Sequence, residues 1–468
     1  MEHFSVDGTW WLVETPDRRV PGMLTFGDDG LSLVAHGSLP ETTDDTSFPR
    51  WTETSVILGQ AYDGRKITLL RAEGANSAHH LVAQTNYKVG LALVGCHTTH
   101  DSFDGAWFEL DCLNAWVDPA PLTSDYTSPF SLRFDNVEMD RAVLGHSEIG
   151  LVAGVSGSVS PSRIRVDQDA AIKLSFPAMP YREPINSWVR PFMDLLIVCL
   201  GRAVRITHFQ LLPTPSTPDD ELKTLLLGNQ YAEAFFPAVQ AAPSHIPSAA
   251  DLLTYTNPTL LTYRDSPVTF AELIPRWYEL RDELKDVYVL LTGPYNAKFI
   301  FDEYRYGAVF QSAESFARSN RFSRREKSPQ AHSDRVEAII NAAVAAGVDS
   351  EHVDWARRVL QARNDKPLWQ LVHELVSSTG EVGRAILAAR PGFASVVASL
   401  RAGVSHPSGR RRIDYRERYW LADALRWVVR AKTLIELGVP LSEIERRVRS
   451  RDGFIRMLDE IRGTSPES

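Results

Sequence analysis

The chain has 468 residues, of which 44% are hydrophobic and 23% are charged, and its formal net charge is −9 at pH 7. This length predicts two or three domains, and the negative charge argues against a protein coated with non-specific nucleic-acid contacts. The three cysteines, Cys96, Cys112 and Cys199, form no CxxC pair, which argues against a disulfide framework and favours a reducing, cytoplasmic setting.

No segment predicts export or membrane insertion. The N-terminus lacks a basic flank followed by an apolar run, so we expect no signal peptide. The most apolar stretch, 192–200, contains Asp194 and is far shorter than the ~20 residues of a membrane span. We therefore expect no membrane partner.

Residues 1 to about 180 predict short β-strands. Apolar or alternating runs recur between turn signals such as 27–30 (Gly-Asp-Asp-Gly) and 63–64 (Asp-Gly). The runs lie at 8–13, 23–26, 31–34, 55–58, 66–70, 90–94 and 106–110. This spacing is typical of an antiparallel sandwich or barrel. Its tryptophans favour core packing over a ligand groove.

The following stretch changes character. A helix is expected from Pro184 to about Cys199, and a strand over 204–212. Residues 213–220 are rich in proline and turn formers, which indicates a domain boundary or linker.

After about residue 265 the hydrophobic pattern predicts helices. We expect them at 268–291, 298–321, 333–346, 350–362, 367–388, 392–405, 415–437 and 441–461. One apolar face of the 392–405 helix is formed by residues at helical spacing, namely Phe393, Val396, Val397, Leu400 and Val404. Ser442 and Glu445 predict a capping box for the last helix.

These patterns predict an α+β multidomain fold, with an N-terminal antiparallel β-rich sandwich or barrel followed by an all-α helical bundle. The predicted boundaries are a β-rich domain at 1–215, a linker or connecting segment at 216–265 and a helical domain at 266–468.

The segment 399–407 carries the most informative motif, Arg401 followed by four residues and His406. Five positions along a straight helix place two side chains about 140° apart. Pro407 disfavours a helical conformation at His406, so that imidazole is expected at or past the helix end, where it can turn toward the cleft beside Arg401.

An arginine and a histidine suit RNA cleavage without a metal. The histidine can transfer protons near neutral pH, and the guanidinium can stabilise the charge that develops on the phosphate. One histidine does not easily serve both ends of the displacement, so two copies of the site at a dimer interface make mechanistic sense.

The region around this motif is locally basic. From Arg401 to Arg451 there are 13 Arg and Lys against 6 Asp and Glu. Arg410, Arg411 and Arg412 are candidate RNA-binding residues, and a solvated helix face is the alternative interpretation.

Metal and cofactor sites are not predicted. Cys96, His97 and His100, with His79 and His80, include zinc ligand types, but no second cysteine pair supports them, and histidines at a loop end are the favoured interpretation. No phosphate-binding loop or nucleophile elbow occurs. We expect no cofactor.

The chain resembles the ApeA-type anti-phage defence proteins with a C-terminal HEPN ribonuclease domain. Residues from about 268 to 440 are similar to the HEPN domain on three matches: the helix 310–318, Arg401 with His406, and the helix around 420–425. The first half is similar to the family's N-terminal domain on 8–11 (Gly-Thr-Trp-Trp) and 20–24 (Val-Pro-Gly-Met-Leu).

The resemblance implies an abortive-infection protein, with a sensor half coupled to a dimeric, metal-independent endoribonuclease. Arg401 and His406 match its catalytic motif. Ala402 stands where many members have Asn, Asp or His, and Ser405 is a candidate replacement donor. Glu314 is a second accessory candidate, although an ion pair with Arg318 is its favoured structural interpretation.

The implied partners are an RNA substrate, a second copy bound through the HEPN domain as a homodimer or higher homo-oligomer, and a phage-derived trigger at the N-terminal domain. Two other functions stay open: a non-catalytic HEPN scaffold or RNA-binding module, and a carbohydrate or peptide receptor whose helical half only dimerises.

Overall fold

The computed structural model describes most of the chain in eleven stretches. They are 3–37, 39, 51–77, 84–117, 137–160, 163–215, 230–237, 259–297, 300–319, 321–405 and 414–463. The chain divides into two units. The first comprises Met1–Leu252, Leu261–Glu279 and Tyr295–Phe299, and the second comprises Leu253–Leu260, Leu280–Pro294 and Ile300–Ser468.

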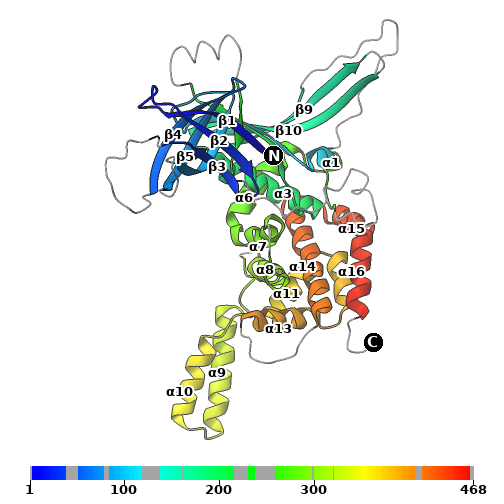
Figure 1. Cartoon of the computed structure of the whole chain (residues 1–468). Coiled ribbons are helices and arrows are strands. Elements are labelled where there is room, and N and C mark those ends of the chain that lie inside the picture. Colours follow the sequence, from blue (N-terminus) through cyan, green and yellow to red (C-terminus); the bar gives the residue numbers. More distant parts are fainter. Residues whose placement is uncertain are drawn as a thin grey trace. The chain divides into compact units, whose positions relative to one another are not determined.

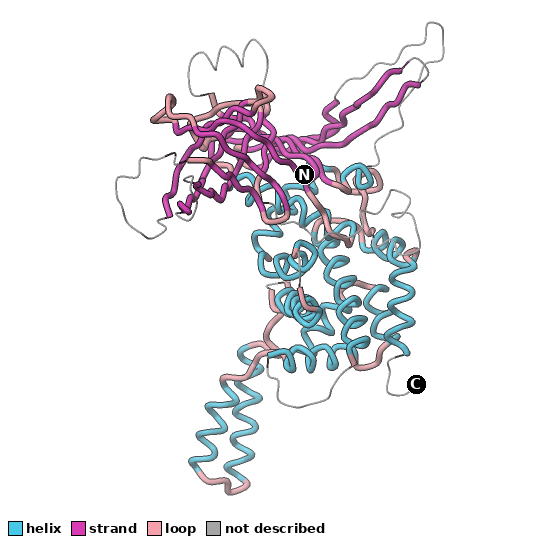
Figure 2. Tube along the Cα trace, viewed as in Figure 1, coloured by secondary structure: helices cyan, strands magenta, loops and turns pink. Residues whose placement is uncertain are grey.

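The first unit contains the strands, coloured magenta in Figure 2. They are β1 (Phe4–Leu12), β2 (Val20–Gly27), β3 (Gly30–Ala35), β4 (Trp51–Ala61), β5 (Lys66–Ser77), β6 (Gln84–Val94), β7 (Phe103–Leu110), β8 (Val137–Leu144), β9 (Ser147–Ser160), β10 (Arg163–Met179), β11 (Ile206–Pro213) and β12 (Ala232–Phe235). The predicted turns at 27–30 and 63–64 connect β2 to β3 and β4 to β5.

The first six strands close into an antiparallel barrel. They pair in the order β3-β2-β1-β4-β5-β6, and β3 returns to β6 through the register Leu33 opposite Tyr87. Closure protects strand edges that an open sheet would expose. From β6 the sheet continues through β12, β11, β7, β10, β9 and β8.

Trp10 belongs to the hydrophobic core of the barrel. Its side chain is fully buried, and its indole N–H donates to the Gly22 carbonyl at 3.0 Å. A Cβ at Gly59 would lie 2.3 Å from the Trp10 ring, so only glycine fits at this position of β4. Trp11 and Trp116 are buried as well, which confirms core packing for these tryptophans.

Short helices accompany the sheet in the first unit: α1 (Leu113–Val117), α2 (Arg182–Pro184), the π-helical turn η1 (Ile185–Val189) and α3 (Arg190–Leu200). The helix expected from Pro184 therefore exists. All ten residues of α3 from Pro191 to Leu200 are buried, including Asp194.

The remaining helices begin with α6 (Phe270–Glu283) and α7 (Lys285–Asn296). They continue with α8 (Asp302–Ala317), α9 (Pro329–Ala345), α10 (Ser350–Gln361), α11 (Leu368–Ser377), α12 (Glu381–Ala389), α13 (Phe393–Ser405), α14 (Tyr415–Glu436), α15 (Leu441–Arg449) and α16 (Asp452–Gly463). In the second unit, α8 packs against α11, α13 and α14.

Three predicted helices are each two helices in the structure. The 268–291 helix is interrupted at Leu284, the 367–388 helix at 378–380 and the 441–461 helix at 450–451. Gly380 explains the second break, because its φ of 64° and ψ of −129° lie outside the helical region, in a conformation that glycine adopts and other residues rarely do.

The predicted capping box is wrong. Helix α15 begins at Leu441 with Pro440 as its N-cap, so Ser442 lies inside the first turn. Glu445 instead accepts a hydrogen bond from the Glu381 backbone N–H at 2.8 Å and caps α12.

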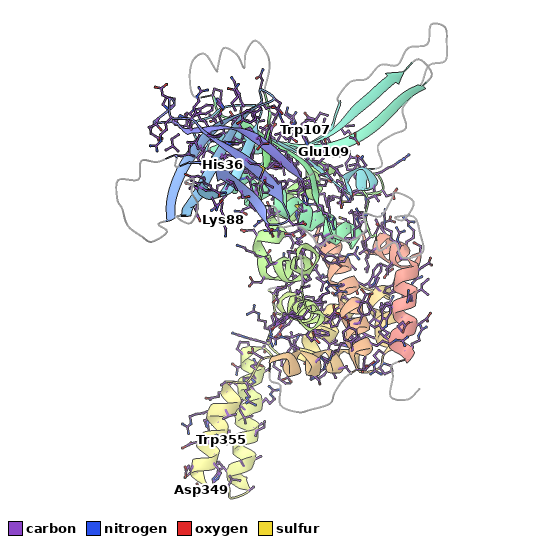
Figure 3. All side chains as sticks on the ribbon, viewed as in Figure 1. His36, Lys88, Trp107, Glu109, Asp349 and Trp355 are labelled. Carbon is purple, nitrogen blue, oxygen red and sulfur yellow. The ribbon has the colours of Figure 1, made fainter. Side chains whose placement is uncertain are left out.

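Helices α9 and α10 form a hairpin that projects from the rest of the helical unit (Figure 1). Its small core consists of Val336, Ile340 and Val353. Asp349 caps α10 at the tip through the Glu351 N–H at 2.8 Å, and Trp355 lies on the outer surface of the hairpin (Figure 3).

The predicted α+β multidomain fold is confirmed: an antiparallel barrel with an extended sheet, followed by an all-α bundle. The domain boundaries at 215 and 265 stay a prediction. The structure assigns 261–279 to the first unit together with the sheet.

Candidate functional site

The candidate site lies where α8 and α13 meet. Phe393, Val397 and Leu400 of α13 are buried, as the apolar pattern predicts. Phe310, Ala313 and Phe316 of α8 are buried as well; together these faces fix the two helices against one another and against α11.

This packing brings Arg401 to Glu314. The Arg401 Nε donates to the Glu314 Oε2 at 2.7 Å, although the two residues are 87 positions apart in sequence. The side chain of Arg401 is 25% exposed and that of Glu314 is 20% exposed. A carboxylate therefore orients the guanidinium, and a quarter of the Arg401 side chain stays open to solvent.

Glu314 holds a second guanidinium at the same time. Arg318, one turn further along α8, donates from its Nε to the Glu314 Oε1 at 2.9 Å. The expected i,i+4 ion pair is thus confirmed, and the same carboxylate also contacts Arg401. Sequence spacing predicts the contact between Glu314 and Arg318 but gives no signal for the contact between Glu314 and Arg401.

This arrangement can orient a phosphate-binding group. An ionised carboxylate accepts hydrogen bonds but donates none. Glu314 can therefore orient the Arg401 guanidinium, but it does not itself bind an anion. A guanidinium oriented in this way can donate hydrogen bonds to phosphate oxygens, which suits a charge that develops during a reaction.

Most of the other predicted site residues lie outside the described residues. His406 and the arginines Arg410, Arg411 and Arg412 fall in 406–413, and the side chain of Ser405 is not described. Helix α13 extends to Ser405, so the position of His406 past this helix stays a prediction.

A second polar cluster, which the sequence analysis missed, lies at the starts of α8 and α14. The Tyr306 hydroxyl donates to the Tyr415 hydroxyl at 2.9 Å, and Tyr415 donates to Asp302. Burial raises the pKa of Tyr306 above its ordinary value, so this phenol stays protonated. The cluster fixes the start of α14, the helix that follows 406–413.

The cysteine and histidines at 96–100 have structural contacts. The His97 Nε2 lies 2.8 Å from the Gly59 carbonyl oxygen, and burial raises the pKa of the Cys96 thiol to about 11. Within the described ranges, no three His, Cys, Asp or Glu side chains gather as metal ligands would. His79 and His80 lie outside those ranges.

The first unit has a pocket of about 400 Å³ beside the barrel. Its apolar wall includes Phe4, Ile67 and Phe235, and His208 lies near Glu233 at its polar side, with 3.8 Å between Nδ1 and Oε1. This volume is within the range of small-ligand sites. Among the tryptophans whose side chains the structure describes in this half, none lines the pocket.

No helix in the described ranges is both long enough and apolar enough to span a bilayer.

Comparison with known families gives two matches. Residues 5–277 match the family model of the ApeA N-terminal domain 1, and residues 308–443 match that of the Apea-like HEPN domain. The second match contains α8 and α13 and therefore the Arg401–Glu314 contact. Comparison with curated proteins and with solved structures gives no match.

Proposed function

The chain belongs to the ApeA-like anti-phage proteins with a C-terminal HEPN domain, and on this premise we propose that it is a metal-independent endoribonuclease activated through its N-terminal domain. The observation that carries the proposal is Arg401, which Glu314 orients at 2.7 Å while a quarter of its side chain remains exposed.

The proposed reaction is an attack of a ribose 2′-hydroxyl on the adjacent phosphorus. His406 accepts the hydroxyl proton as the O2′–P bond forms, and Arg401 donates hydrogen bonds to the phosphorane oxygens. The P–O5′ bond then breaks, and the leaving 5′-oxygen takes a proton from the His406 of a second protomer. The products are a 2′,3′-cyclic phosphate and a 5′-hydroxyl.

Two copies of the site would supply the two proton transfers, so a homodimer through the HEPN domain is part of the proposal. Residues of the basic run, Arg410, Arg411 and Arg412, would hold the RNA near this cleft. Ser405 would provide the hydrogen-bond donor that Ala402 lacks.

The N-terminal unit is proposed as the sensor. A phage-derived trigger would bind there and release the nuclease, which implies that the chain is inactive before infection. The pocket beside the barrel is a candidate position for such a ligand.

Cleavage of RNA in the presence of EDTA tests the nuclease. Activity of the full chain should survive the chelator and disappear in both Arg401→Ala and His406→Ala. Wild-type rates in either variant would contradict the assignment.

A non-catalytic RNA-binding scaffold is the second candidate, because the Arg401–Glu314 contact also serves as an ordinary structural ion pair. A scaffold would bind RNA in a salt-dependent manner and leave it intact under every condition of the cleavage assay.

A further inference from the structure

The base of the α9–α10 hairpin is built as a rigid neck, which we define as residues 321–327 and 362–367. The two segments are joined by backbone hydrogen bonds from Lys366 N–H to the Arg324 carbonyl and from Glu326 N–H to the Asn364 carbonyl, both at 2.8 Å. The Asn364 side chain adds bonds to both backbone groups of Lys327, at 3.2 and 2.9 Å.

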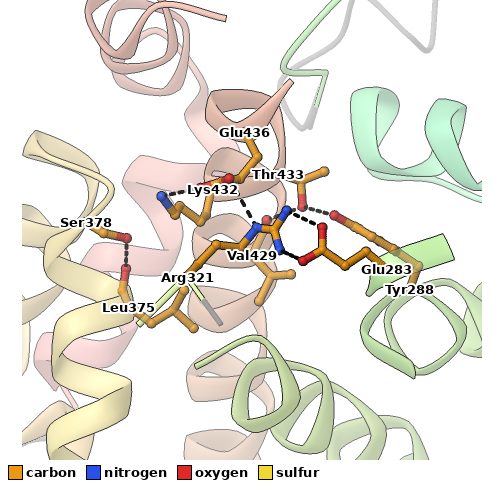
Figure 4. Close-up of polar contacts among 9 residues, drawn as sticks. All are labelled: Glu283, Tyr288, Arg321, Leu375, Ser378, Val429, Lys432, Thr433 and Glu436. Atoms are coloured by element: carbon orange, nitrogen blue, oxygen red, sulfur yellow. Dashed lines mark hydrogen bonds and ion pairs between the residues drawn. The ribbon is translucent and has the colours of Figure 1, made fainter. Parts of the chain in front are cut away.

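Ion pairs anchor the neck to the helical bundle. At its start, Arg321 binds Glu283, with 2.7 Å between Nη2 and Oε2, and also binds Glu436 from its Nε at 3.2 Å (Figure 4). At its end, the Lys366 ammonium contacts the Glu374 carboxylate at 2.6 Å. The neck is therefore held in place rather than free to move with the hairpin.

Four further cations of the neck are exposed: Arg324, Arg325, Lys327 and Arg363. Within the described ranges, none of the four has a carboxylate within ion-pair distance. Of the two acidic residues of the neck, Glu326 pairs with Arg335 at 2.9 Å, and Asp365 forms no ion pair with the four cations within the described ranges. In a chain of net charge −9, this uncompensated positive cluster is a local exception.

The neck is connected to Arg401 through three direct contacts. Arg324 donates from its Nε to the Arg318 carbonyl. Arg318 binds Glu314 at 2.9 Å, and Glu314 binds Arg401 at 2.7 Å. These contacts link Arg324 of the neck to the candidate catalytic arginine within the helical unit.

We propose that Arg324, Arg325, Lys327 and Arg363 bind consecutive phosphates of the RNA strand whose scissile phosphate lies at Arg401. This inference rests on the proposed nuclease function and adds a substrate-binding surface distinct from Arg410, Arg411 and Arg412. Phosphate contacts fix the register of a strand without reading its bases, so the neck should serve RNAs of different sequence equally.

The test is binding of a fluorescein-labelled, 2′-O-methylated oligouridylate to the full chain, measured by fluorescence anisotropy over a salt titration. The modified ribose lacks the attacking hydroxyl, so binding is read without cleavage. Replacing all four cations with alanine should weaken binding at low salt by roughly tenfold or more. The slope of log K against log salt should fall by about 0.7 for each phosphate that the variant no longer binds.

Two matched variants distinguish the effect of where the four cations lie from the effect of the total charge. The first variant replaces four exposed cations elsewhere on the helical unit with alanine, namely Lys285, Arg305, Arg358 and Arg456. It changes the net charge by the same amount and should leave the affinity for RNA within about twofold of the parent. The variant Arg324→Lys, Arg325→Lys and Arg363→Lys keeps the charge and should keep the salt slope. Equal thermal unfolding of all variants verifies folding.

Parental affinity and slope in the neck variant would overturn the proposal, as would failure of the parent to bind the RNA. Cleavage of unmodified RNA is measured separately and reports on the nuclease itself. If the neck variant binds and cleaves RNA like the parent, the neck is not an RNA-binding surface, and the proposed nuclease function is unaffected.

Discussion

Glu314 accepts hydrogen bonds from two guanidinium groups, and the two contacts have different consequences. The contact with Arg318 is local to α8 and adds a few tenths of a kcal/mol to helix stability, in the range of about 0.2–0.5 kcal/mol for such pairs. The contact with Arg401 joins α8 to α13 and sets the direction of the group that we place on the phosphate. Glu314 is therefore a positioning residue.

Glu314→Gln should lower kcat for RNA cleavage with a smaller change in KM. The amide still fills the site but loses the charge that orients Arg401, and misplacing a reacting group costs roughly tenfold to a hundredfold in rate. Steady-state kinetics on a short RNA give both constants.

Arg318→Gln is the matched control, because it removes the other partner of Glu314 and leaves Arg401 paired. Its kcat should stay within about twofold of the parent, as expected for an exposed ion pair of small energy. Equal losses in the two variants would show that Glu314 acts on stability and not on Arg401.

The pKa of Glu443 should make stability depend on pH. A hydrogen bond from Arg446, together with one from Arg447, holds this pKa at about 2, below its ordinary value of 4.5. A lowered carboxylate pKa stabilises the fold above the unfolded value, and this contribution is lost as pH falls toward the folded value.

Glu443→Gln should therefore lower the free energy of unfolding by about 1–2 kcal/mol at neutral pH, because the buried Arg447 loses a charged partner. The difference between parent and variant should shrink as pH falls from 4.5 toward 2. Urea unfolding at several pH values measures it, and a difference that does not change with pH would refute the assignment.

At the scale of elements, α11 and α12 approach each other closely at Gly383. A Cβ at Gly383 would lie 1.9 Å from the Val376 carbonyl oxygen, which is a backbone atom that cannot move aside. Gly383→Ala should separate the two helices and lower the free energy of unfolding by about 1–3 kcal/mol, the usual range for overpacking.

Gly463→Ala is the control for this substitution. A Cβ at Gly463 meets no heavy atom within 4 Å at the end of α16, so the change should be neutral or slightly stabilising, by up to about 1 kcal/mol. Chemical denaturation compares both variants with the parent. A neutral Gly383→Ala would mean that the α11–α12 approach is looser than described.

Periodicity predicts where these helices lie but not where they are interrupted. The 3.6-residue pattern continues through Gly380 and through 450–451, because both neighbours of each break turn their apolar faces to the same core. Glu445 shows a related limit. Its spacing from Ser442 fits a local capping box, yet its carboxylate caps α12 from another helix.

In the candidate site too, the sequence identifies individual residues but not the contacts between them. Arg401 and His406 could be chosen from their spacing and from Pro407, and Glu314 from its spacing to Arg318. The contact between Glu314 and Arg401 depends on how α8 and α13 pack, and the neck depends on a backbone ladder between 321–327 and 362–367. Neither arrangement has a signal in a single sequence.

At the scale of the whole molecule, alternation and turn residues predict many antiparallel strands but not the closure of six of them. Closure requires β3 to pair with β6, which lies about 50 residues later and has no local signal. Helix α6 is a second example. Its helical pattern resembles the bundle, yet Trp277 donates to the Pro191 carbonyl at 2.8 Å and Tyr278 donates to the Trp188 carbonyl at 2.6 Å, both within the first unit.

The proposed shared active site predicts that cleavage depends on self-association. Activity per chain should rise with protein concentration and follow the fraction of dimer measured by analytical ultracentrifugation, because each cleft needs groups from two protomers. Constant activity per chain across a transition from monomer to dimer would contradict a shared cleft.

The central claim is that a ribose 2′-hydroxyl attacks the adjacent phosphorus with the help of Arg401 and His406. A comparison of two RNA substrates tests this claim most directly. An RNA that the full chain cleaves in EDTA is compared with the same RNA carrying a single 2′-deoxyribose immediately 5′ of the cleavage position. We predict a 2′,3′-cyclic phosphate and a 5′-hydroxyl from the first RNA and no cut at that position in the second. Cleavage of the deoxy-substituted RNA, or products with a 5′-phosphate, would contradict the account.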